Sequence, residues 1–347
     1  MNGNRLNLAL VSGVIALGLL SQGFAQEAPR RVITRIMGDL YRAQNNNHNS
    51  AFLVTPEGII VADPLNPEFA AWLKQQLNER FGVPVRYVVY SHHHWDHASG
   101  GAVFADTAQF VGHANMLTYL AMPPDSTTLA EVVGQYAPVA ALDTNGNGRV
   151  ERSEASGQLD DAQFLGFDAN GDDVLSGAEV VRGPVSQVHP PTMTYEDELE
   201  LTLGGKRVRL EWVGEMNHSF DMSRITFPEE STMLVVDYIT FGRLPFREMD
   251  YENGMFEEWM AAIRETEELS KNYEHVTTGH GPLGNSYNVT EWRVYFERLH
   301  EAVAAGIAAD QSLEEMRADI RIPEYAHWNG YDWLDENVLG MYHFLTD

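Results

Sequence analysis

Four potential metal ligands lie within six residues of this chain, and they constrain its fold more than any other feature. In the segment His92-His93-His94-Trp95-Asp96-His97, they are His92, His94, Asp96 and His97. The segment follows residues 85–90 (VRYVVY), whose β-branched and aromatic side chains predict a strand. A loop that leaves a strand can turn alternate side chains to one side, and imidazole and carboxylate groups are typical zinc ligands. The motif therefore predicts a metal site at the end of a strand.

Strand and helix signals alternate along the chain, which predicts an α/β fold. A turn signal at 55–58 separates two β-rich runs and predicts a hairpin. Residues 121–188 have no strand signal and are rich in Gly, Asp and Asn, so we interpret them as an insertion. Further strands are expected at 207–213, 224–227, 233–237 and 275–277, a strand and helix at 109–120, and helices at 67–80, 255–270, 290–309 and 335–345.

Three later segments carry histidine or aspartate in recurring surroundings. They are 213–218 (VGEMNH), 234–237 (LVVD) and the turn 279–282 (GHGP). Together with the first motif, these segments resemble the metallo-β-lactamase superfamily from about residue 32 to the C-terminus, apart from the insertion. The resemblance implies an α/β fold of the αββα sandwich type, with the insertion as a small helical addition.

The resemblance also implies two metal ions, which we expect to be zinc, with iron as the alternative. Two zinc ions about 3.5–4 Å apart lower the pKa of a shared water, and the metal-bound hydroxide attacks a carbonyl or phosphoryl centre. Asp96 is the candidate catalytic residue, because it can orient the hydroxide and transfer its proton. Asp63 resembles the family's buried aspartate that supports the ligands, with an ordinary turn residue as the alternative. The implied ligands are His92, His94 and His218 for one ion, Asp96, His97 and His280 for the other, and Asp237 as the bridge.

A bridging aspartate resembles the lactonase, glyoxalase II and phosphodiesterase branches of the family. Trp95 and segment 215–219 depart from the family's common surroundings, which leaves the substrate open. We expect a dinuclear zinc hydrolase that cleaves an ester, lactone, amide or β-lactam bond in a small-molecule substrate. The alternatives are a mononuclear iron oxygenase similar to persulfide dioxygenases, and a non-catalytic calcium-dependent binding protein. Arg243 is a candidate for substrate recognition, whereas His48 and His93 have no spacing that indicates a role.

The insertion contains two loops that match the calcium-binding EF-hand pattern at positions 1, 3, 5, 7, 9 and 12. In the second loop Asp173 replaces the glycine of position 6, where the backbone must be left-handed, and Asp tolerates that conformation. Val150 and Leu175, both at position 8, can pair the loops through a short β-bridge. One or two calcium ions would stabilise the insertion or shape access to the metal cleft, and we favour stabilisation. The predicted ligands are Asp143, Asn145, Asn147, Arg149, Glu151 and Glu154, then Asp168, Asn170, Asp172, Val174, Ser176 and Glu179, with Arg149 and Val174 acting through backbone carbonyls.

Composition limits the binding partners and the cellular compartment that we expect for this protein. The 50 Asp and Glu against 23 Lys and Arg give a formal charge of −27, which argues against nucleic acid as a partner. The absence of cysteine excludes disulfides, thiolate metal ligands and cysteine nucleophiles. An apolar run at 6–20, too short for a membrane span, precedes a small-residue cleavage signal, so 1–25 is predicted to be a signal peptide, with an uncleaved anchor as the alternative. We expect a periplasmic or secreted mature chain without a membrane segment, with a catalytic domain at 26–120 and 189–347 and the insertion at 121–188.

Overall fold

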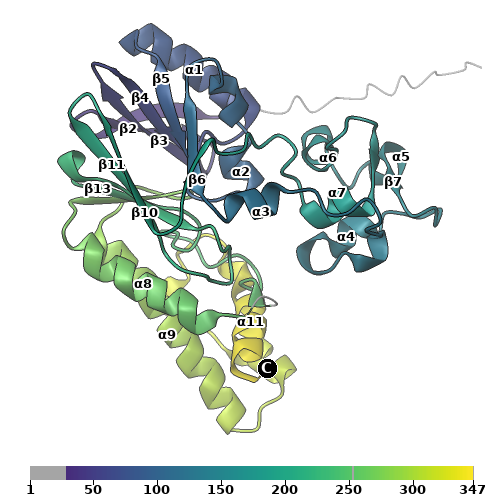
Figure 1. Ribbon diagram of the computed structural model, residues 1–347. Helices are drawn as coiled ribbons and strands as arrows, with labels where there is room; N and C mark the ends of the chain where they lie inside the picture. Colours follow the sequence, from purple (N-terminus) through teal and green to yellow (C-terminus); the bar gives the residue numbers. More distant parts are fainter. Residues whose placement is uncertain (1–28, 252–253, 347) are drawn as a thin grey trace, which may run out of the picture.

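Two β-sheets pack face to face at the centre of the protein, and helices cover their outer faces (Figure 1). This computed structural model describes residues 29–251 and 254–346, so the signal peptide predicted at 1–25 lies outside the described residues. The seven-stranded sheet has the spatial order β1-β2-β3-β4-β5-β6-β9, and the five-stranded sheet has the order β10-β11-β12-β13-β14. The strands are β1 (Arg31–Met37), β2 (Leu40–Asn45), β3 (His48–Thr55), β4 (Gly58–Ala62), β5 (Val85–Val89), β6 (Gln109–His113), β9 (Met193–Tyr195), β10 (Glu198–Leu203), β11 (Lys206–Trp212), β12 (Ser223–Phe227), β13 (Thr232–Val235) and β14 (His275–Thr278).

Three apolar layers confirm the αββα architecture. Leu53 and Val89 of the first sheet meet Val208 and Ile225 of the second, and all four are fully buried between the sheets. A second layer lies between the outer face of the first sheet and α1, and a third between the second sheet and the C-terminal helices. Removing this apolar surface from water is the main force that holds the four layers together.

The covering helices begin and end at recognisable sequence signals. In α1, the Asn66 side chain accepts a hydrogen bond from the backbone of Phe69, Pro67 takes the first position, and Gly82 ends the helix with φ 65°. Ser312 and Glu315 form a capping box at the start of α10. The helices outside the insertion are α1 (Pro67–Phe81), α2 (Trp95–Ala98), α3 (Met116–Leu120), α8 (Phe256–Ser270), α9 (Ser286–Ala308), α10 (Leu313–Asp319) and α11 (Leu334–Thr346).

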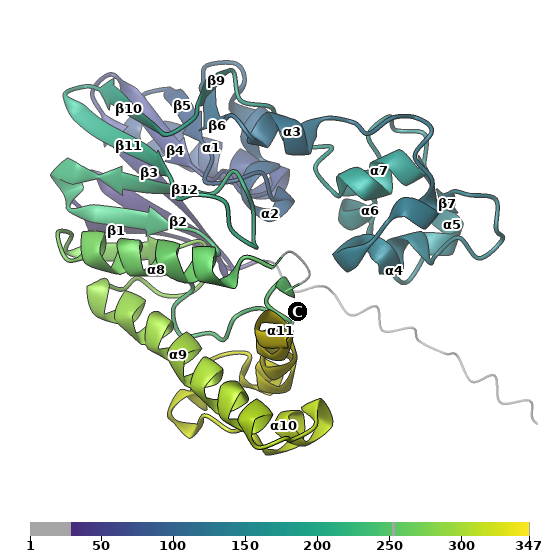
Figure 2. The same ribbon diagram turned by 60° about the horizontal axis from the view of Figure 1, so that its bottom comes forward.

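The insertion forms a lobe beside α2 and α3 (Figures 1 and 2). It has its own small core, in which Val150, Phe164, Leu175 and Val180 are buried. Val150 pairs with Leu175 in an antiparallel bridge, which confirms the predicted link between the two loops. Its elements are α4 (Ala137–Ala140), β7 (Val150–Glu151), α5 (Arg152–Ala155), α6 (Asp161–Phe167), β8 (Val174–Leu175) and α7 (Gly177–Arg182).

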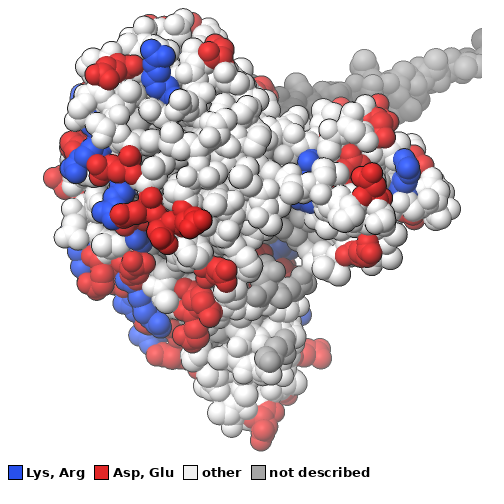
Figure 3. All heavy atoms as spheres, in the orientation of Figure 1, with Lys and Arg blue, Asp and Glu red and all other residues white. Residues whose placement is uncertain are grey.

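Four strands were not predicted. They are β1 and β2, whose sequences carry arginines at exposed or half-buried positions, and β9 and β10, which precede the point where strands were expected to resume. On the face drawn in Figure 3, lysine and arginine side chains lie beside acidic ones and form no continuous basic patch. Within the described residues, no helix is both long and apolar enough to span a membrane.

Candidate metal centre

The predicted ligands lie where strands of both sheets end. The first motif follows β5, and the backbone amide of Ser223 at the start of β12 donates to the carbonyl of Ser91, which joins the two sheets at this point (2.8 Å). His218 lies in the loop before β12, Asp237 lies two residues after β13, and His280 lies two residues after β14. Because β13 and β14 are parallel neighbours, their carboxyl ends bring Asp237 and His280 to the same edge.

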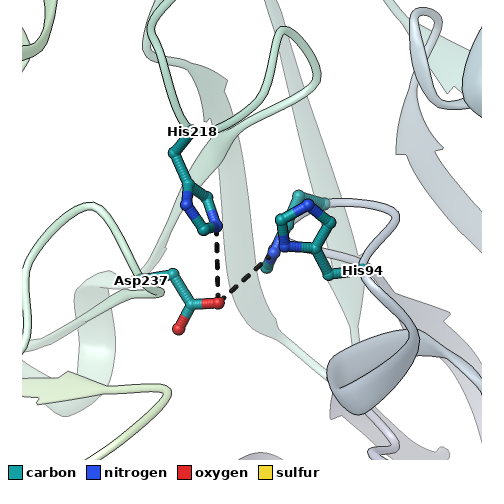
Figure 4. A group of neighbouring side chains, drawn as sticks. His94, His218 and Asp237 are labelled. Atoms are coloured by element: carbon teal, nitrogen blue, oxygen red, sulfur yellow. Dashed lines mark ion pairs between the residues drawn. The ribbon is translucent and has the colours of Figure 1, made fainter. Parts of the chain in front are cut away.

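Seven side chains converge at this edge in two groups. In Figure 4, His94, His218 and Asp237 point toward one another from three separate segments. Within each group one ligand atom of every residue lies within 4.8 Å of the others, and Asp237 belongs to both groups. The groups are His92, His94, His218 and Asp237, and Asp96, His97, His280 and Asp237, the same sets that the resemblance implied.

Asp237 is surrounded by imidazole nitrogens. Its Oδ2 lies 3.1 Å from His97 Nε2, 3.4 Å from His92 Nε2 and 3.6 Å from His218 Nε2. Its Oδ1 lies 3.2 Å from His280 Nε2. Asp237 has a left-handed backbone with φ 60°, which turns the chain sharply at the end of β13. The strain is located at the residue that both groups share.

Charges in this cluster act strongly on one another. Burial alone would lower the pKa of each imidazole, but nearby carboxylates, above all Asp237, raise the pKa of His97 and of His218 to about 10. For His92 burial dominates and lowers the pKa to about 4, and the pKa of His94 falls well below its ordinary value. The pKa of Asp237 is well below its ordinary value, because the charge of His97 and the other histidines outweighs burial.

The residues present fit bound metal ions. His92 Nε2, His218 Nε2 and Asp237 Oδ1 are buried and make no hydrogen bond within the described residues. Leaving a buried polar atom unpaired is costly, and ligation of metal ions would satisfy all three atoms. A donor set of imidazole nitrogen and carboxylate oxygen without sulfur suits zinc or iron.

Asp63 connects the end of β4 to the ligand loop. It is fully buried and accepts hydrogen bonds from the amide (2.8 Å) and the hydroxyl (2.7 Å) of Ser91. The Ser91 hydroxyl also lies 2.9 Å from His92 Nδ1, and Asp63 Oδ2 lies 3.8 Å from His97 Nδ1. Burial raises the pKa of Asp63 to about 6, although the charge of His97 opposes this. These contacts favour a supporting role over that of an ordinary turn residue.

Two residues near the ligands were missed by sequence reasoning. His48 Nε2 lies 3.3 Å from Asp96 Oδ2, and the His48 ring lies 4.5 Å from the ring of His280. Asp250 Oδ2 lies 3.2 Å from His218 Nδ1. Neither residue has a local spacing signal, because each reaches the site only through tertiary structure.

His93 belongs to neither group of ligands and joins two ligand loops. Its Nδ1 lies 3.0 Å from Asp221 Oδ1, and its ring stacks on Tyr119 at 3.9 Å. Asp221 is buried three residues after His218. The ion pair therefore holds the His92–His94 segment against the His218 loop.

Arg243 lies on the loop between Asp237 and Asp250. Its guanidinium stacks over Trp333 (4.8 Å) and Phe246 (5.7 Å). It forms no ion pair with a carboxylate of residues 29–251 or 254–346. Burial lowers the pKa of Arg243, and the charges of Asp237 and Asp96 oppose that effect. The Arg243 cation, which has no ion-pair partner in the part of the chain that the structure describes, thus lies within the electric field of the candidate metal centre.

In the lobe, each predicted calcium loop folds around its first and last carboxylates. The Asp143 carboxylate accepts from the amides of Gly146 (2.8 Å) and Gly148 (2.9 Å), and Glu154 accepts from the amide of Thr144 (3.0 Å). The middle positions also interact, because Asn145 donates to Glu151 (3.1 Å) and Asn147 donates to the same carboxylate.

The second loop has the same arrangement. Asp168 accepts from the amides of Gly171 (2.7 Å) and Asp173 (3.1 Å), and Glu179 accepts from the amide of Ser176 (2.8 Å). Asn170 donates to Asp172 (3.1 Å). Asp173 has φ 61°, the left-handed conformation predicted for position 6.

Comparison of the sequence with models of protein families identifies the family of this chain. The model of the metallo-beta-lactamase superfamily matches residues 44–248. The chain belongs to the metallo-beta-lactamase superfamily. Of the seven predicted ligands of this metallo-beta-lactamase-fold protein, all but His280 lie in the matched range.

Solved structures agree with this fold. The stereoselective inverting sec-alkylsulfatase Pisa1 from Pseudomonas sp. is 15% identical with a TM-score of 0.57, covering 90% of this chain and 50% of that chain. The DIM-1 metallo-beta-lactamase is 11% identical with a TM-score of 0.50, covering 77% of this chain and 97% of that chain. These identities show the fold alone, and this chain spans only half the length of the alkylsulfatase. No curated protein matches the sequence.

Proposed function

We propose that this metallo-beta-lactamase-fold protein is a dinuclear zinc hydrolase that cleaves an ester, lactone, amide or β-lactam bond in a small molecule. The position of Asp237 carries the proposal, because this one carboxylate belongs to both groups of ligands. A carboxylate shared in this way supports a bridge between two ions. His92, His94 and His218 would hold one ion, and Asp96, His97 and His280 would hold the other.

The chain's own groups would supply proton transfer and orientation. Bound zinc ions lower the pKa of a water molecule and polarise the bond to be cleaved. Asp96 Oδ2 lies 3.3 Å from His48 Nε2 and 3.4 Å from His97 Nε2, which holds its carboxylate at the edge of the cluster. The charge of His97 outweighs burial and keeps the pKa of Asp96 well below its ordinary value, so the carboxylate is ionised and able to accept a proton.

The surroundings of the ligands support a substrate with an apolar part. Trp95, next to Asp96, is 41% exposed, and Phe220, two residues after His218, is 37% exposed. Exposed aromatic side chains beside a polar site are typical of small-molecule pockets. Arg243 would bind an anionic group of the substrate.

The lobe would bind one or two calcium ions through loops 143–154 and 168–179. Each loop supplies carboxylate, amide and backbone oxygens at the spacing that calcium prefers. Calcium would stabilise the lobe by binding the folded state only. With the predicted signal peptide at 1–25, we place the mature enzyme in the periplasm or outside the cell.

A hydrolysis panel tests the proposed reaction. The zinc-loaded protein would be assayed with a chromogenic β-lactam, an acyl lactone, a thioester, a phosphodiester and an aryl sulfate, the last because an alkylsulfatase has this fold. We expect turnover of one class, abolished by Asp96→Ala. The control is Asp106→Ala, which removes an exposed aspartate that is ion-paired with Lys74. Absence of turnover across the panel would count against a hydrolase of these bond types.

Elemental analysis separates zinc hydrolysis from the iron alternative. The second group of ligands, Asp96, His97 and His280 with Asp237, supports two metals rather than one. We expect two zinc ions per chain. One iron per chain would replace the proposal with an iron oxygenase.

A further inference from the structure

His218, a candidate metal ligand, lies in a loop that no regular secondary structure fixes. The loop joins β11 to β12, and residues 213–222 contain no helix or strand. Backbone N–H and C=O groups outside helices and strands need other partners where they are shielded from water, and side chains can supply them. On one side of His218, the buried side chain of Asn217 donates to the carbonyl of Met249 (2.7 Å). On the other side, the loop is held by residues of α3.

Side chains from α3 and β11 hold both backbone groups of Phe220, two residues after His218. The amide of Phe220 donates to the hydroxyl of Tyr119 (3.1 Å). The carbonyl of Phe220 accepts from the side-chain amide of Asn115 (2.8 Å) and from the indole N–H of Trp212 (2.9 Å). Asn115 directly precedes α3, and Tyr119 belongs to it. The start and the end of this short helix therefore clamp the loop that carries His218.

The ring of Tyr119 reaches a second ligand segment. It stacks face to face on the ring of His93, with the two centroids 3.9 Å apart and an angle of 4° between the planes. His93 stands between the candidate ligands His92 and His94 in the sequence. Through its ring and its hydroxyl, Tyr119 thus contacts both segments that supply the histidines of the first group of ligands, His92, His94 and His218.

We propose that Tyr119 is a positioning residue of the metal centre, which holds the His218 loop and the His92–His94 segment at the spacing that one metal ion requires. The inference rests on the proposed two-ion centre and adds a residue that belongs to neither group of ligands. Residues that orient metal ligands from behind typically contribute 10–100-fold to metal affinity. In the second group, His280 follows β14 and lies outside the clamped loop. The effect of Tyr119 should therefore fall mainly on the first ion.

Hydrogen exchange tests the clamp without any metal. In the metal-free protein, the amide of Phe220 should exchange slowly, because it donates to Tyr119. Tyr119→Phe removes the hydroxyl and keeps the ring that stacks on His93, so this amide should exchange about 2–10-fold faster. The matched control is Tyr325→Phe, which removes a hydroxyl that donates to the carbonyl of Glu291 (3.3 Å) in the C-terminal region. Equal exchange rates of this amide in wild type and Tyr119→Phe would overturn the proposal.

Zinc binding tests the effect on each ion separately. The Kd would be measured by chelator competition in His280→Ala, which leaves the first group of ligands intact, and in His218→Ala, which leaves the second group intact. We expect Tyr119→Phe to raise the zinc Kd about 10–100-fold in the first background and by less than about twofold in the second. Tyr325→Phe should change neither Kd. An equal loss of affinity in both backgrounds would show general destabilisation, and it would reject the positioning role as surely as no loss in either.

A second variant reaches the same loop from the carbonyl side. Asn115→Ala removes a donor to Phe220 and leaves the Tyr119 side chain unchanged. The zinc Kd of the first group should rise in this variant too, and by less than in Tyr119→Phe, because Trp212 still donates to the same carbonyl. A larger rise in the Kd of the second group than of the first would contradict the clamp.

Failure of the proposed function would look different. If the wild-type protein binds no zinc, the two-ion centre is rejected, and the positioning role of Tyr119 is rejected with it. If wild type binds two zinc ions and Tyr119→Phe binds both with unchanged affinity, the centre stands and the role of Tyr119 falls.

Discussion

Zinc binding to the metal-free protein should release protons, because the ligands compete with protons for zinc. The pKa of His97 and that of His218 are about 10, so both imidazoles are protonated at pH 7. A protonated imidazole cannot bind a metal ion, and each must lose its proton first. His92, with a pKa of about 4, and His94, whose pKa is lower than usual, are already neutral and release none.

The number of protons follows from these groups. His97 and His218 contribute one each, which gives two. The pKa of His280 is also raised, since Asp237 outweighs burial, so His280 adds part of a third, and a water bound by zinc adds at most about one more. With two protons released, the combined binding constant for both ions should rise about a hundredfold per pH unit near neutrality.

Calorimetry measures this release directly. Zinc would be titrated into the metal-free protein at pH 7 in two buffers of different ionisation enthalpy, and the difference in heat gives the protons released. Asp237→Asn is the control, since it removes the charge that raises both pKa values and should release fewer protons per zinc bound. A release below about one proton for two zinc ions would refute the reasoning. The metal-free Tm should also fall as pH rises from 6.5 through about 10, because the charged His97 pairs stabilise the fold fully only below that window.

Three further predictions follow from other sites. Asp63→Asn should lower zinc affinity about 10–100-fold in a chelator competition. The Tm of the metal-free protein should not fall, because the substitution removes the charge of a buried carboxylate, whose pKa is raised by burial to about 6. An unchanged zinc affinity would make Asp63 a turn residue only. Calcium at a hundred times its Kd should raise the Tm of the lobe by roughly 10–20 °C, and this rise should shrink in Glu154→Gln and Glu179→Gln. Equal Tm values with and without calcium would remove the stabilising role. Arg243→Gln should raise KM about tenfold or more for substrates with a carboxylate or sulfate group and leave the KM of uncharged substrates unchanged. The control is Arg247→Gln, which changes an exposed neighbour that is ion-paired with Glu336. An equal effect on both substrate types would argue against anion binding by Arg243.

The four candidate ligands of the first motif and their place after a strand were predictable from the sequence pattern, whereas the other three were implied by the resemblance to the family. His92 and Asp237 follow strands of mostly apolar side chains and His280 follows the short strand β14, and the geometry of a sheet brings such positions to one edge. His48 could not be found in the same way. It is 48 residues from Asp96 and lies beside it only because β3 starts at the edge where β5 ends. The position of Asp250 beside His218 likewise depends on the course of a loop without regular structure.

The missed strands have two different causes. β10 alternates Glu and Leu at 198–201, a period-two pattern that predicts a strand, so the sequence does carry the signal there. In β1 the alternation is broken by Arg31 and Arg35 and most side chains are exposed or half-buried, so pairing with β2 rather than burial holds the strand in place. Local pattern identifies buried strands better than edge strands for this reason.

The core of the lobe links the second calcium loop to the helices on either side of it. Tyr136 packs between Phe167, which directly precedes the loop 168–179, and Gly183, which follows the helix that begins in that loop. Any change in the angle between α6 and α7 must therefore move this ring. Calcium at this loop would fix that angle, so the stabilising effect of calcium on the lobe follows from the packing of its core around the loop.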